Sequence, residues 1–381
     1  MSSNLIYRLI VCVLFFFMMR AGGDVYAQRG KFWEKGIGKL ILKADSLLYA
    51  SQMSGIDSSY IDRPELNRQV YFGSFNYLQF YDFHLPFDNS DAAGYMDDME
   101  PYQYYNVNMH TFQAEFDLGI DYKGLCIELP IPLHNLYNIS LGLARTGSVW
   151  GFRIRYKYMR HMNGSVKWGM HDYYKERGID MSDLYYENIP DNLNNLKTLY
   201  LEGYYVLNNK RFSLSAGVFA DMVQKRSQGS MFLMGNWHRS LYTGEQLFHG
   251  DKETFRLSQI SLGAGYGYNL VMCNRKLLVH ASLIPMFSAY QKVSHSIYET
   301  DNVVDKGDIK DYEYDKYYYA VDATPKFVVN GFARLAMSYN WHKHYLFTFL
   351  LNYRQYLYSN KCGFNIHNYE LDSQVNIAYR F

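Results

Sequence analysis

The sequence is poor in cysteine, which limits how it could be cross-linked or could bind a metal ion. Four cysteines occur in 381 residues, and Cys12 lies in an apolar run near the start of the chain. The other three are Cys126, Cys273 and Cys362, an odd number whose spacing matches no metal-binding motif. An oxidising compartment would allow one disulfide, but we favour cysteines that act as small buried or lipid-facing apolar residues. We also expect no metal site and no cofactor.

Long apolar runs and an excess of positive charge are also missing. Beyond residue 27, no stretch approaches the roughly 20 apolar residues that a membrane helix needs. The formal net charge is +1, and the sequence has no basic stripe of the kind that binds nucleic acid, so we expect no nucleic-acid partner. An exported chain without membrane helices can still cross a bilayer as a closed β-barrel, because closure pairs every backbone group inside lipid.

Aromatic residues, in contrast, are abundant. The chain contains 39 Tyr and 24 Phe. A Tyr side chain joins an apolar ring to a polar hydroxyl, so it suits a boundary between an apolar phase and water. Many such residues in one chain indicate a membrane surface or an aromatic binding face.

The first 27 residues have the pattern of a secretory signal peptide. Arg8 precedes an apolar run at residues 9–19, and Val25, Tyr26 and Ala27 provide a cleavage site of the A-x-A type. The mature protein is then predicted to consist of a periplasmic segment over residues 28–66 and a β-barrel over residues 67–381.

The periplasmic segment contains a helical pattern. Apolar residues recur at helical spacing between Trp33 and Leu48, with Lys35, Lys39 and Lys43 between them. This predicts a short amphipathic helix over residues 32–49, placed across the barrel mouth or against the membrane. A flexible tether is the alternative.

From about residue 70 the period of the apolar residues changes from 3.6 to 2, which is typical of strands. The clearest segments are residues 111–122, 125–133, 150–158, 212–220, 260–268 and 371–381. Weaker segments are residues 70–84, 165–175, 196–206, 230–241, 277–291, 327–341 and 345–358. The strands are long enough to span a bilayer at a tilt.

These 13 segments cannot all be correct. A closed barrel with both termini on one side needs an even number of strands, and the alternation of short turns and long loops fails near residues 223–229. We therefore expect an all-β, transmembrane, antiparallel up-and-down barrel of 12 to 14 strands.

Aromatic residues gather beside the predicted short turns at residues 122–124, 208–210 and 342–344, as in the girdle of a membrane barrel. The predicted girdle consists of Tyr122, Tyr204, Tyr266, Tyr268, Tyr339, Trp341, Tyr345 and Tyr379.

The closing strand ends in Tyr379 and Phe381, which resembles the C-terminal signal read by the barrel-assembly machinery of bacterial outer-membrane proteins. Several runs in order also resemble the Bacteroidota outer-membrane family called domain of unknown function 4421. These runs lie at residues 121–125, 204–213, 224–230, 263–269 and 379–381. The resemblance implies a barrel in the bacterial outer membrane, with outer-membrane lipid, lipopolysaccharide and the assembly machinery as partners, and implies no activity.

The inward, polar faces of the early strands carry charges of opposite sign. The acidic side chains are Glu115, Asp117, Asp121 and Glu128, and the basic ones are Arg153, Arg155 and Lys157. Charges on neighbouring strands can pair and fill a narrow lumen, or they can line a channel and set its ion selectivity. For 12 to 14 strands we expect the filled lumen.

One pair of residues suggests a weak candidate for catalysis. His280 and Ser282 are two positions apart on one strand and therefore share a face. A His beside a Ser can activate it if a third group orients the ring, and outer-membrane lipid hydrolases carry a His-x-Ser pair. In those enzymes an Asn and a small residue come directly after the Ser. Here Leu283 follows Ser282 instead, and no acidic partner is identifiable.

The sequence thus favours a structural or surface-binding outer-membrane barrel with a charged, largely filled lumen and without catalysis. A narrow channel for small solutes and an outer-membrane lipid hydrolase are the alternatives.

Overall fold

A computed structural model provides the fold of the chain. Besides Ser46 and Ala50, it describes residues 55–66, 68–87, 103–133, 138–160, 163–168, 186–189, 194–245, 252–306, 309–317, 327–359 and 365–381. The predicted signal peptide lies outside the described residues. The predicted helix over residues 32–49 does so too, except for Ser46, which is helical.

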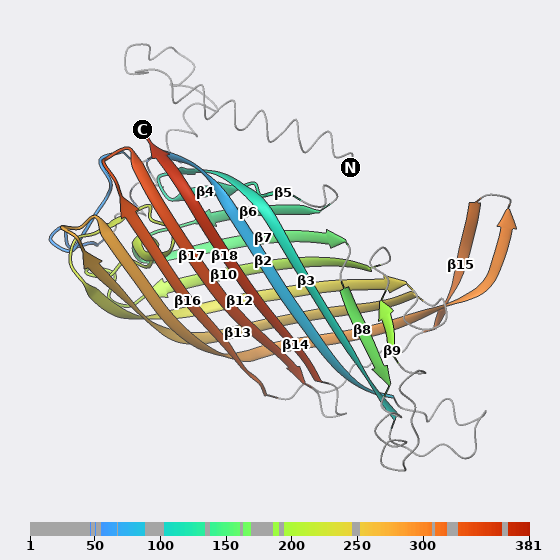
Figure 1. The fold of residues 1–381 in the computed structure, drawn as a ribbon. Helices are drawn as coiled ribbons and strands as arrows, with labels where there is room; N and C mark the ends of the chain where they lie inside the picture. The colour runs from blue at the N-terminus through green and yellow to red at the C-terminus, as the bar shows by residue number, and fades with distance from the viewer. Residues whose placement is uncertain are drawn as a thin grey trace, which may run out of the picture.

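Twelve antiparallel strands form a closed barrel in which neighbours along the chain are neighbours in the ring (Figure 1). The strands are β2 (Arg68–Phe87), β3 (Gln103–Tyr122), β4 (Leu125–Glu128), β6 (Ile139–Arg145), β7 (Trp150–Arg160), β10 (Asn194–Val206), β12 (Gln228–Glu245), β13 (Lys252–Met272), β14 (Leu277–Lys306), β16 (Val329–Asn340), β17 (Tyr345–Ser359) and β18 (Asn365–Arg380). The ring closes where β18 pairs with β2. The predicted architecture and strand number are therefore confirmed.

The third strand is interrupted. After β4 it continues as β5 (Ile131–Pro132), which still pairs with β3. Pro130 lies in the gap between them and has no N–H to donate to a neighbouring strand. The amides of Leu129 and Leu133 bond back to β3 on either side of the break.

Three corrections turn the 13 predicted segments into twelve strands. Strand β6 was not predicted, because it is only seven residues long and small residues interrupt its alternation. Of the predicted segment 165–175, the structure describes residues 165–168. They belong to β8 (Asn163–Trp168), which pairs with β9 (Tyr186–Ile189) and with the end of β3, outside the ring. Residues 212–220 form a helix and adjacent turns, described below.

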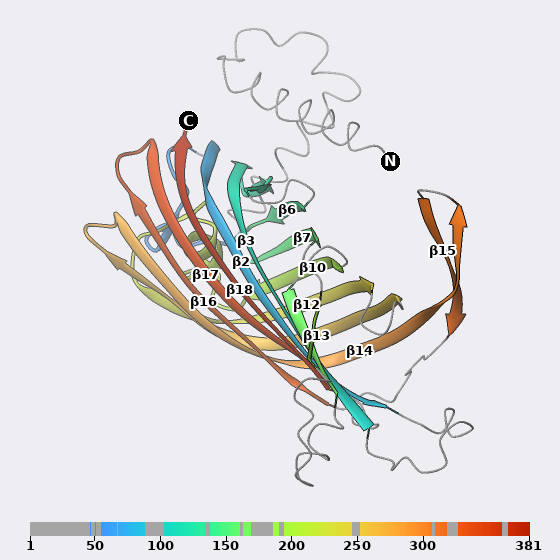
Figure 2. The ribbon, with the colours of Figure 1, turned by 45° about the vertical axis from the view of Figure 1, so that its right-hand side comes forward.

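The connections differ at the two ends of the barrel. Four short connections, at residues 123–124, 146–149, 273–276 and 341–344, share one end with the C-terminus, and we call this the turn end. The opposite end is the loop end. There β14 continues past the ring and pairs with β15 (Ile309–Tyr317) in a projecting hairpin (Figures 1 and 2).

The outer face of the ring is apolar. Outward side chains such as Phe72, Phe112, Leu262 and Val375 are exposed around it, as expected for a surface in contact with lipid. Among the described residues, no helix has the length and apolar character needed to cross a membrane.

An aromatic girdle surrounds the turn end. Six of the predicted members are exposed there: Tyr266, Tyr268, Tyr339, Trp341, Tyr345 and Tyr379. Tyr122 is half-buried. The prediction for Tyr204 is wrong, because this side chain points inward and is 6% exposed, whereas Tyr205 is 50% exposed.

A plug closes the lumen at the turn end. It consists of residues 207–227, the connection between β10 and β12, so residues 208–210 begin this excursion and are not a short turn. Its helix α4 (Leu214–Val218) is fully buried, and the Ser213 hydroxyl caps it by accepting from the amide of Ala216. Residues 212–220 show an apolar alternation that predicts a strand, but eight of these nine residues are buried, so the alternation does not separate an inner from an outer face.

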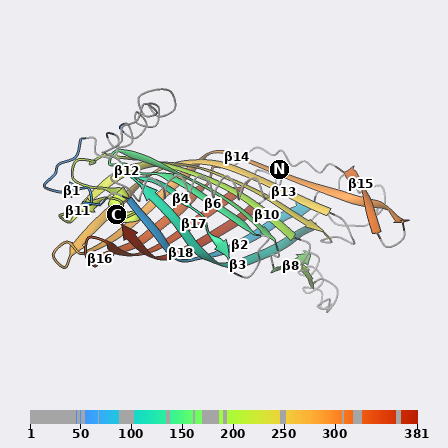
Figure 3. The same cartoon turned by 90° about the horizontal axis from the view of Figure 1, so that it is seen from above.

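The described residues just before the barrel are attached to this plug through backbone pairing. Strand β1 (Ile61–Asp62) pairs with β11 (Val223–Gln224) of the plug, at the turn end (Figure 3). The Lys225 Nζ lies 2.7 Å from the Asp62 Oδ2. This contact lowers the pKa of the Asp62 carboxyl, because an ammonium donor favours its charged form.

This pairing predicts a cross-link. Asp62 and Val223 are directly paired across an antiparallel ladder, and such pairs have Cα atoms close enough for a disulfide. With the native cysteines replaced by Ser, the double variant Asp62→Cys/Val223→Cys should oxidise to an internal disulfide, seen as faster migration on a non-reducing gel. Single-cysteine variants are the control. Two thiols that stay free to react with maleimide in the folded barrel would contradict the pairing.

Candidate functional site

The most unusual part of the molecule is the middle of the lumen, where charged side chains are buried together. The described lumen and plug bury eight carboxylates and seven Lys or Arg side chains, so the interior is close to neutral. The acids are Glu115, Asp117, Asp121, Glu128, Glu202, Asp221, Glu370 and Asp372; the bases are Arg145, Arg153, Arg155, Lys157, Arg334, Arg354 and Arg380.

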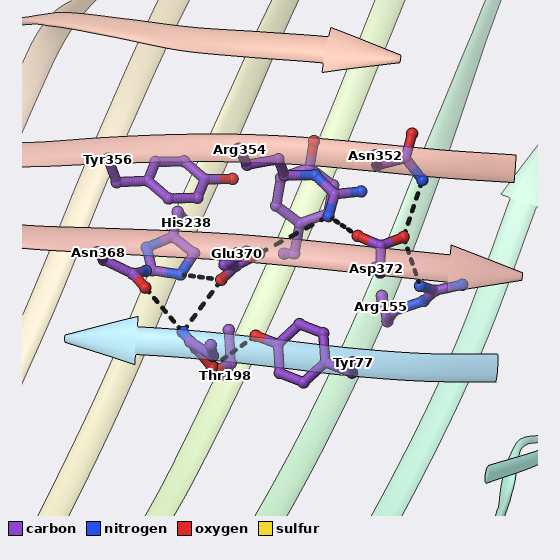
Figure 4. A network of polar contacts seen from close by, with 12 residues as sticks. Tyr77, Arg155, Thr198, His238, Asn352, Arg354, Tyr356, Asn368, Glu370 and Asp372 are labelled. Atoms are coloured by element: carbon purple, nitrogen blue, oxygen red, sulfur yellow. Dashed lines mark hydrogen bonds and ion pairs between the residues drawn. The ribbon is translucent and has the colours of Figure 1, made fainter. Parts of the chain in front are cut away.

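A continuous chain of ion pairs crosses the lumen from β4 to β18. Glu128 accepts from Arg153, with its Oε1 2.7 Å from the Arg153 Nη2, and also from Arg155. Arg155 in turn lies 3.7 Å from the Asp372 Oδ2. Arg354 pairs with Asp372 and lies 3.7 Å from the Glu370 Oε2. We call these six residues the ion-pair chain, and Figure 4 shows its β17 and β18 end.

Further polar groups continue the network beyond Glu370 (Figure 4). The His238 Nε2 lies 3.3 Å from the Glu370 Oε1, and the His238 ring stacks on Tyr356 at 4.2 Å between centroids. Gln79 donates to the same Glu370 oxygen at 3.2 Å and accepts from the Tyr77 hydroxyl. Because buried polar groups are costly when unpaired, these contacts hold strands β2, β12 and β18 in one arrangement.

The seven charges predicted to form one lumen cluster are all buried, but they separate into several groups. Arg153 and Arg155 share Glu128, as described. Glu115 accepts from Gln113, and Asp117 accepts from Gln374 and Asn376, so these two acids bond to neutral amides.

The remaining two predicted residues have other neighbours. Asp121 accepts from the amide of Gly124 in the adjoining turn. The Lys157 Nζ lies 2.8 Å from the centroid of the Tyr77 ring, a cation–π contact.

Sequence reasoning missed several partners of this network. Asp372, Arg354, Glu370, Glu202 and Arg334 lie on inward positions of strands, so the alternation could have identified each of them as a lumen residue. The Glu202 and Arg334 pair joins β10 to β16 across the barrel. Alternation alone does not say which strand lies opposite which, so the pairings themselves were not predictable.

An aromatic layer fills the lumen between the charged region and the loop end. Its members are large inward side chains that are almost fully buried, and they belong to one packed cluster. They include Tyr81, Phe83, Tyr242, Phe255, Tyr356 and Tyr358. Phe83 and Phe255 pack with ring centroids 4.8 Å apart. Tyr81 and Tyr358 direct their hydroxyls toward Ser240 and His238.

Two small cavities lie among these described layers. A cavity of about 50 Å³ lies between the plug and the wall, lined by residues that include Phe219, Glu128 and Asn376. A second cavity, beside Lys157 and Arg354, has about 10 Å³. Spaces of this size hold a few water molecules and no larger solute.

The candidate catalytic pair forms a hydrogen-bonded chain with a third residue. The His280 Nε2 lies 3.1 Å from the Ser282 Oγ, and the His280 Nδ1 lies 2.8 Å from the Asn269 Oδ1. This order of nucleophile, base and orienting group can activate a hydroxyl. Asn269 lies on the neighbouring strand β13, so the sequence did not identify it as the third member.

The same residues are in contact with the plug. The Asn269 Nδ2 donates to the carbonyl of Ser213 at 2.8 Å. A Cβ added to Gly217 would lie 2.7 Å from both the Asn269 Oδ1 and the His280 ring, so α4 packs directly on them. Ser282 is 8% exposed and lines neither described cavity. In the part of the chain that the structure describes, no group of three potential metal ligands is found.

The sequence profile of the family described as "Domain of unknown function (DUF4421)" matches residues 56–381. A search of curated proteins finds no match. The similar solved structures named below are outer-membrane barrels of low sequence identity, so none of their activities transfers to this chain.

Three of these structures illustrate the similarity. The outer-membrane protease OmpT from Escherichia coli has 11% identity and a TM-score of 0.40, covering 82% of this chain and 96% of its own. The translocator domain of autotransporter NalP from Neisseria meningitidis has 10% identity and a TM-score of 0.32, covering 90% and 96%. The toluene transporter TodX from P. putida has 7% identity and a TM-score of 0.25, covering 87% and 94%.

The ion-pair chain predicts a large effect of a conservative substitution. Glu128→Gln leaves Arg153 and Arg155 buried without their shared carboxylate, which should lower the free energy of unfolding by about 3 kcal/mol. Glu65→Gln, at an exposed position before the barrel, should change it by less than about 0.5 kcal/mol. Denaturant unfolding in detergent, followed by tryptophan fluorescence, measures both. Equal stability of the two variants would contradict the pairing.

Proposed function

The chain belongs to the family of domain of unknown function 4421, and we propose that it is an outer-membrane barrel with a sealed lumen that acts through its surface. The observation that carries this proposal is the stacking of plug, ion-pair chain and aromatic layer along one lumen. The apolar outer face and the aromatic girdle support placement in a membrane. The turn end, with the C-terminus, then faces the periplasm, and the loop end faces outward.

The contents of the lumen argue against a channel. Eight strands are just filled by side chains and 16 to 18 leave an aqueous path, so the contents decide for twelve. Ion selectivity needs charges of one sign that face a path. Here Arg153, Arg155 and Arg354 bond to buried carboxylates, so their charges are already neutralised.

The hydrolase alternative is less well supported. The chain from Asn269 to Ser282 has the right order of groups, but a substrate carbonyl would need space beside the Ser282 hydroxyl. That hydroxyl is enclosed, and α4 packs on His280. The three residues serve to seat the plug, since Asn269 also donates to the plug backbone.

The closing strand supports a role for the assembly machinery as a partner during biogenesis. Tyr379 is exposed on the outer face, and its ring stacks with that of Phe381. The amide of Phe381 donates to the carbonyl of Arg68, so the last residue lies at the seam where the ring closes. A C-terminal aromatic signal at this seam is accessible until β2 and β18 pair.

Conductance in planar bilayers tests the sealed lumen. The wild-type barrel should show no stable open steps. Gly217→Val should disturb the plug, because the added side chain meets Asn269 and His280, but the ion-pair chain and the aromatic layer should still block the path. Gly203→Ala is the matched control, since its Cβ would meet nothing nearer than 3.8 Å.

Two results would overturn the proposal. Large, stable steps from the wild-type protein would show an open lumen. Stable steps from Gly217→Val but not from Gly203→Ala would show that the plug alone seals a pore, which is the behaviour of a gated channel.

A further inference from the structure

Five basic side chains project outward from the barrel near its loop end. They are Arg160 on β7, Lys197 on β10, Arg239 on β12, Arg256 on β13 and Lys292 on β14, and all five are exposed. These strands are consecutive around the ring (Figure 1). We call this set the outer basic patch.

The strand register brings these residues together. Lys197 and Arg256 both pair with Leu241, so they lie in one row on either side of β12. Arg239 and Lys292 both pair with Ser258, so they lie in the next row on either side of β13. Neighbouring strands are about 4.8 Å apart and diagonal neighbours about 7–8 Å, so several long cationic side chains can reach the same anion.

The patch lies at the level of the outer lipid headgroups. On β13, Arg256 is ten residues from Tyr266 of the turn-end girdle. At about 3.4 Å per residue and a tilt of about 40°, this separation is about 26 Å along the barrel axis, close to the height of the apolar band of a membrane barrel. The row just below the patch contains Trp237 and Tyr290, the aromatic residues expected at that interface.

The outer basic patch carries charge of one sign. On β10, β12, β13 and β14, none of the described outward side chains between the turn end and the patch is a carboxylate. Like charges on neighbouring strands repel one another, so an anion bound among them would lower this repulsion. On the opposite strands β16, β17, β18, β2 and β3, no described outward position toward the loop end carries Lys or Arg. The patch is therefore a localised feature and not a general property of the outer rim.

We propose that the outer basic patch binds the phosphorylated glucosamine headgroup of lipopolysaccharide. This inference rests on the proposed outer-membrane location, where lipopolysaccharide forms the outer leaflet. Its phosphates lie at the level of the patch, and the forked guanidinium groups of Arg239 and Arg256 suit bidentate contact with phosphate oxygens. Ser258 lies between Arg239 and Lys292 in the register and offers a hydroxyl to the sugar.

Binding of defined lipids to the purified barrel in zwitterionic detergent tests this site, with native mass spectrometry as the readout. The probes are bisphosphorylated lipid A, lipid A without phosphates and phosphatidylglycerol. Arg239→Gln/Arg256→Gln should weaken the binding of bisphosphorylated lipid A on the order of tenfold or more, because each basic group near a headgroup contributes measurably. Arg68→Gln/Lys123→Gln, which removes two cations at the turn end, should bind lipid A as the wild type does.

The comparison of lipids on the wild-type protein needs no variant and keeps the test decisive if the double variant fails to fold. Lipid A without phosphates should bind at least tenfold more weakly than the bisphosphorylated form. Equal binding of these two lipids, equal binding of phosphatidylglycerol, or an equal loss in the turn-end control would each overturn the proposal. Conductance does not enter this measurement, so a failure here is distinct from a failure of the sealed lumen.

Discussion

The constraint on which this structure depends is that every charged side chain inside a closed barrel needs a partner, either an opposite charge or a polar or aromatic group. Twelve strands enclose a lumen too narrow to hydrate each inward Lys, Arg, Asp and Glu, and the cost of leaving one such charge unpaired is several kcal/mol. The eight buried acids and seven buried bases meet this constraint nearly in balance. The ion-pair chain follows from it: Glu128 serves two arginines, and Asp372 serves Arg155 and Arg354. The plug closes the turn end, and the aromatic layer fills the side toward the loop end.

Much of the barrel could be predicted from the alternation of apolar and polar residues, because every strand has one face in lipid and one in the lumen. The errors occurred where this relation fails. Strand β6 is short and contains Gly142 and Ala144, so its alternation is weak. Residues 212–220 of the plug show an alternation of apolar residues without forming a strand. They are buried in the lumen, so the alternation does not mark an inner and an outer face. Ser213 before a short apolar run is a helix-capping signal that the strand pattern obscured.

The candidate site could be predicted only in part. The alternation identifies Glu128, Arg153 and Arg155 as lumen residues, and inward charges on early strands suggest pairing. It does not show that Arg155 reaches Asp372 on β18 or that Glu202 reaches Arg334, because contacts across the lumen depend on ring size and register. The contacts that tie His280 and Ser282 to the plug could not be predicted either, because Asn269 and the plug come from other parts of the chain. The outer basic patch was likewise invisible until the register brought five separate strands together.

Thiol accessibility at the centre of the ion-pair chain tests the filled lumen most directly. Asn352 lies inward on β17 and donates to the Asp372 Oδ2 at 2.8 Å. With the native cysteines replaced by Ser, Asn352→Cys should not react with a charged, membrane-impermeant thiol reagent in the folded barrel, and should react fully after denaturation. A protein that keeps only the exposed Cys273 provides the reference rate. Labelling of Asn352→Cys at the rate of Cys273 would show a water-filled lumen and would contradict the account.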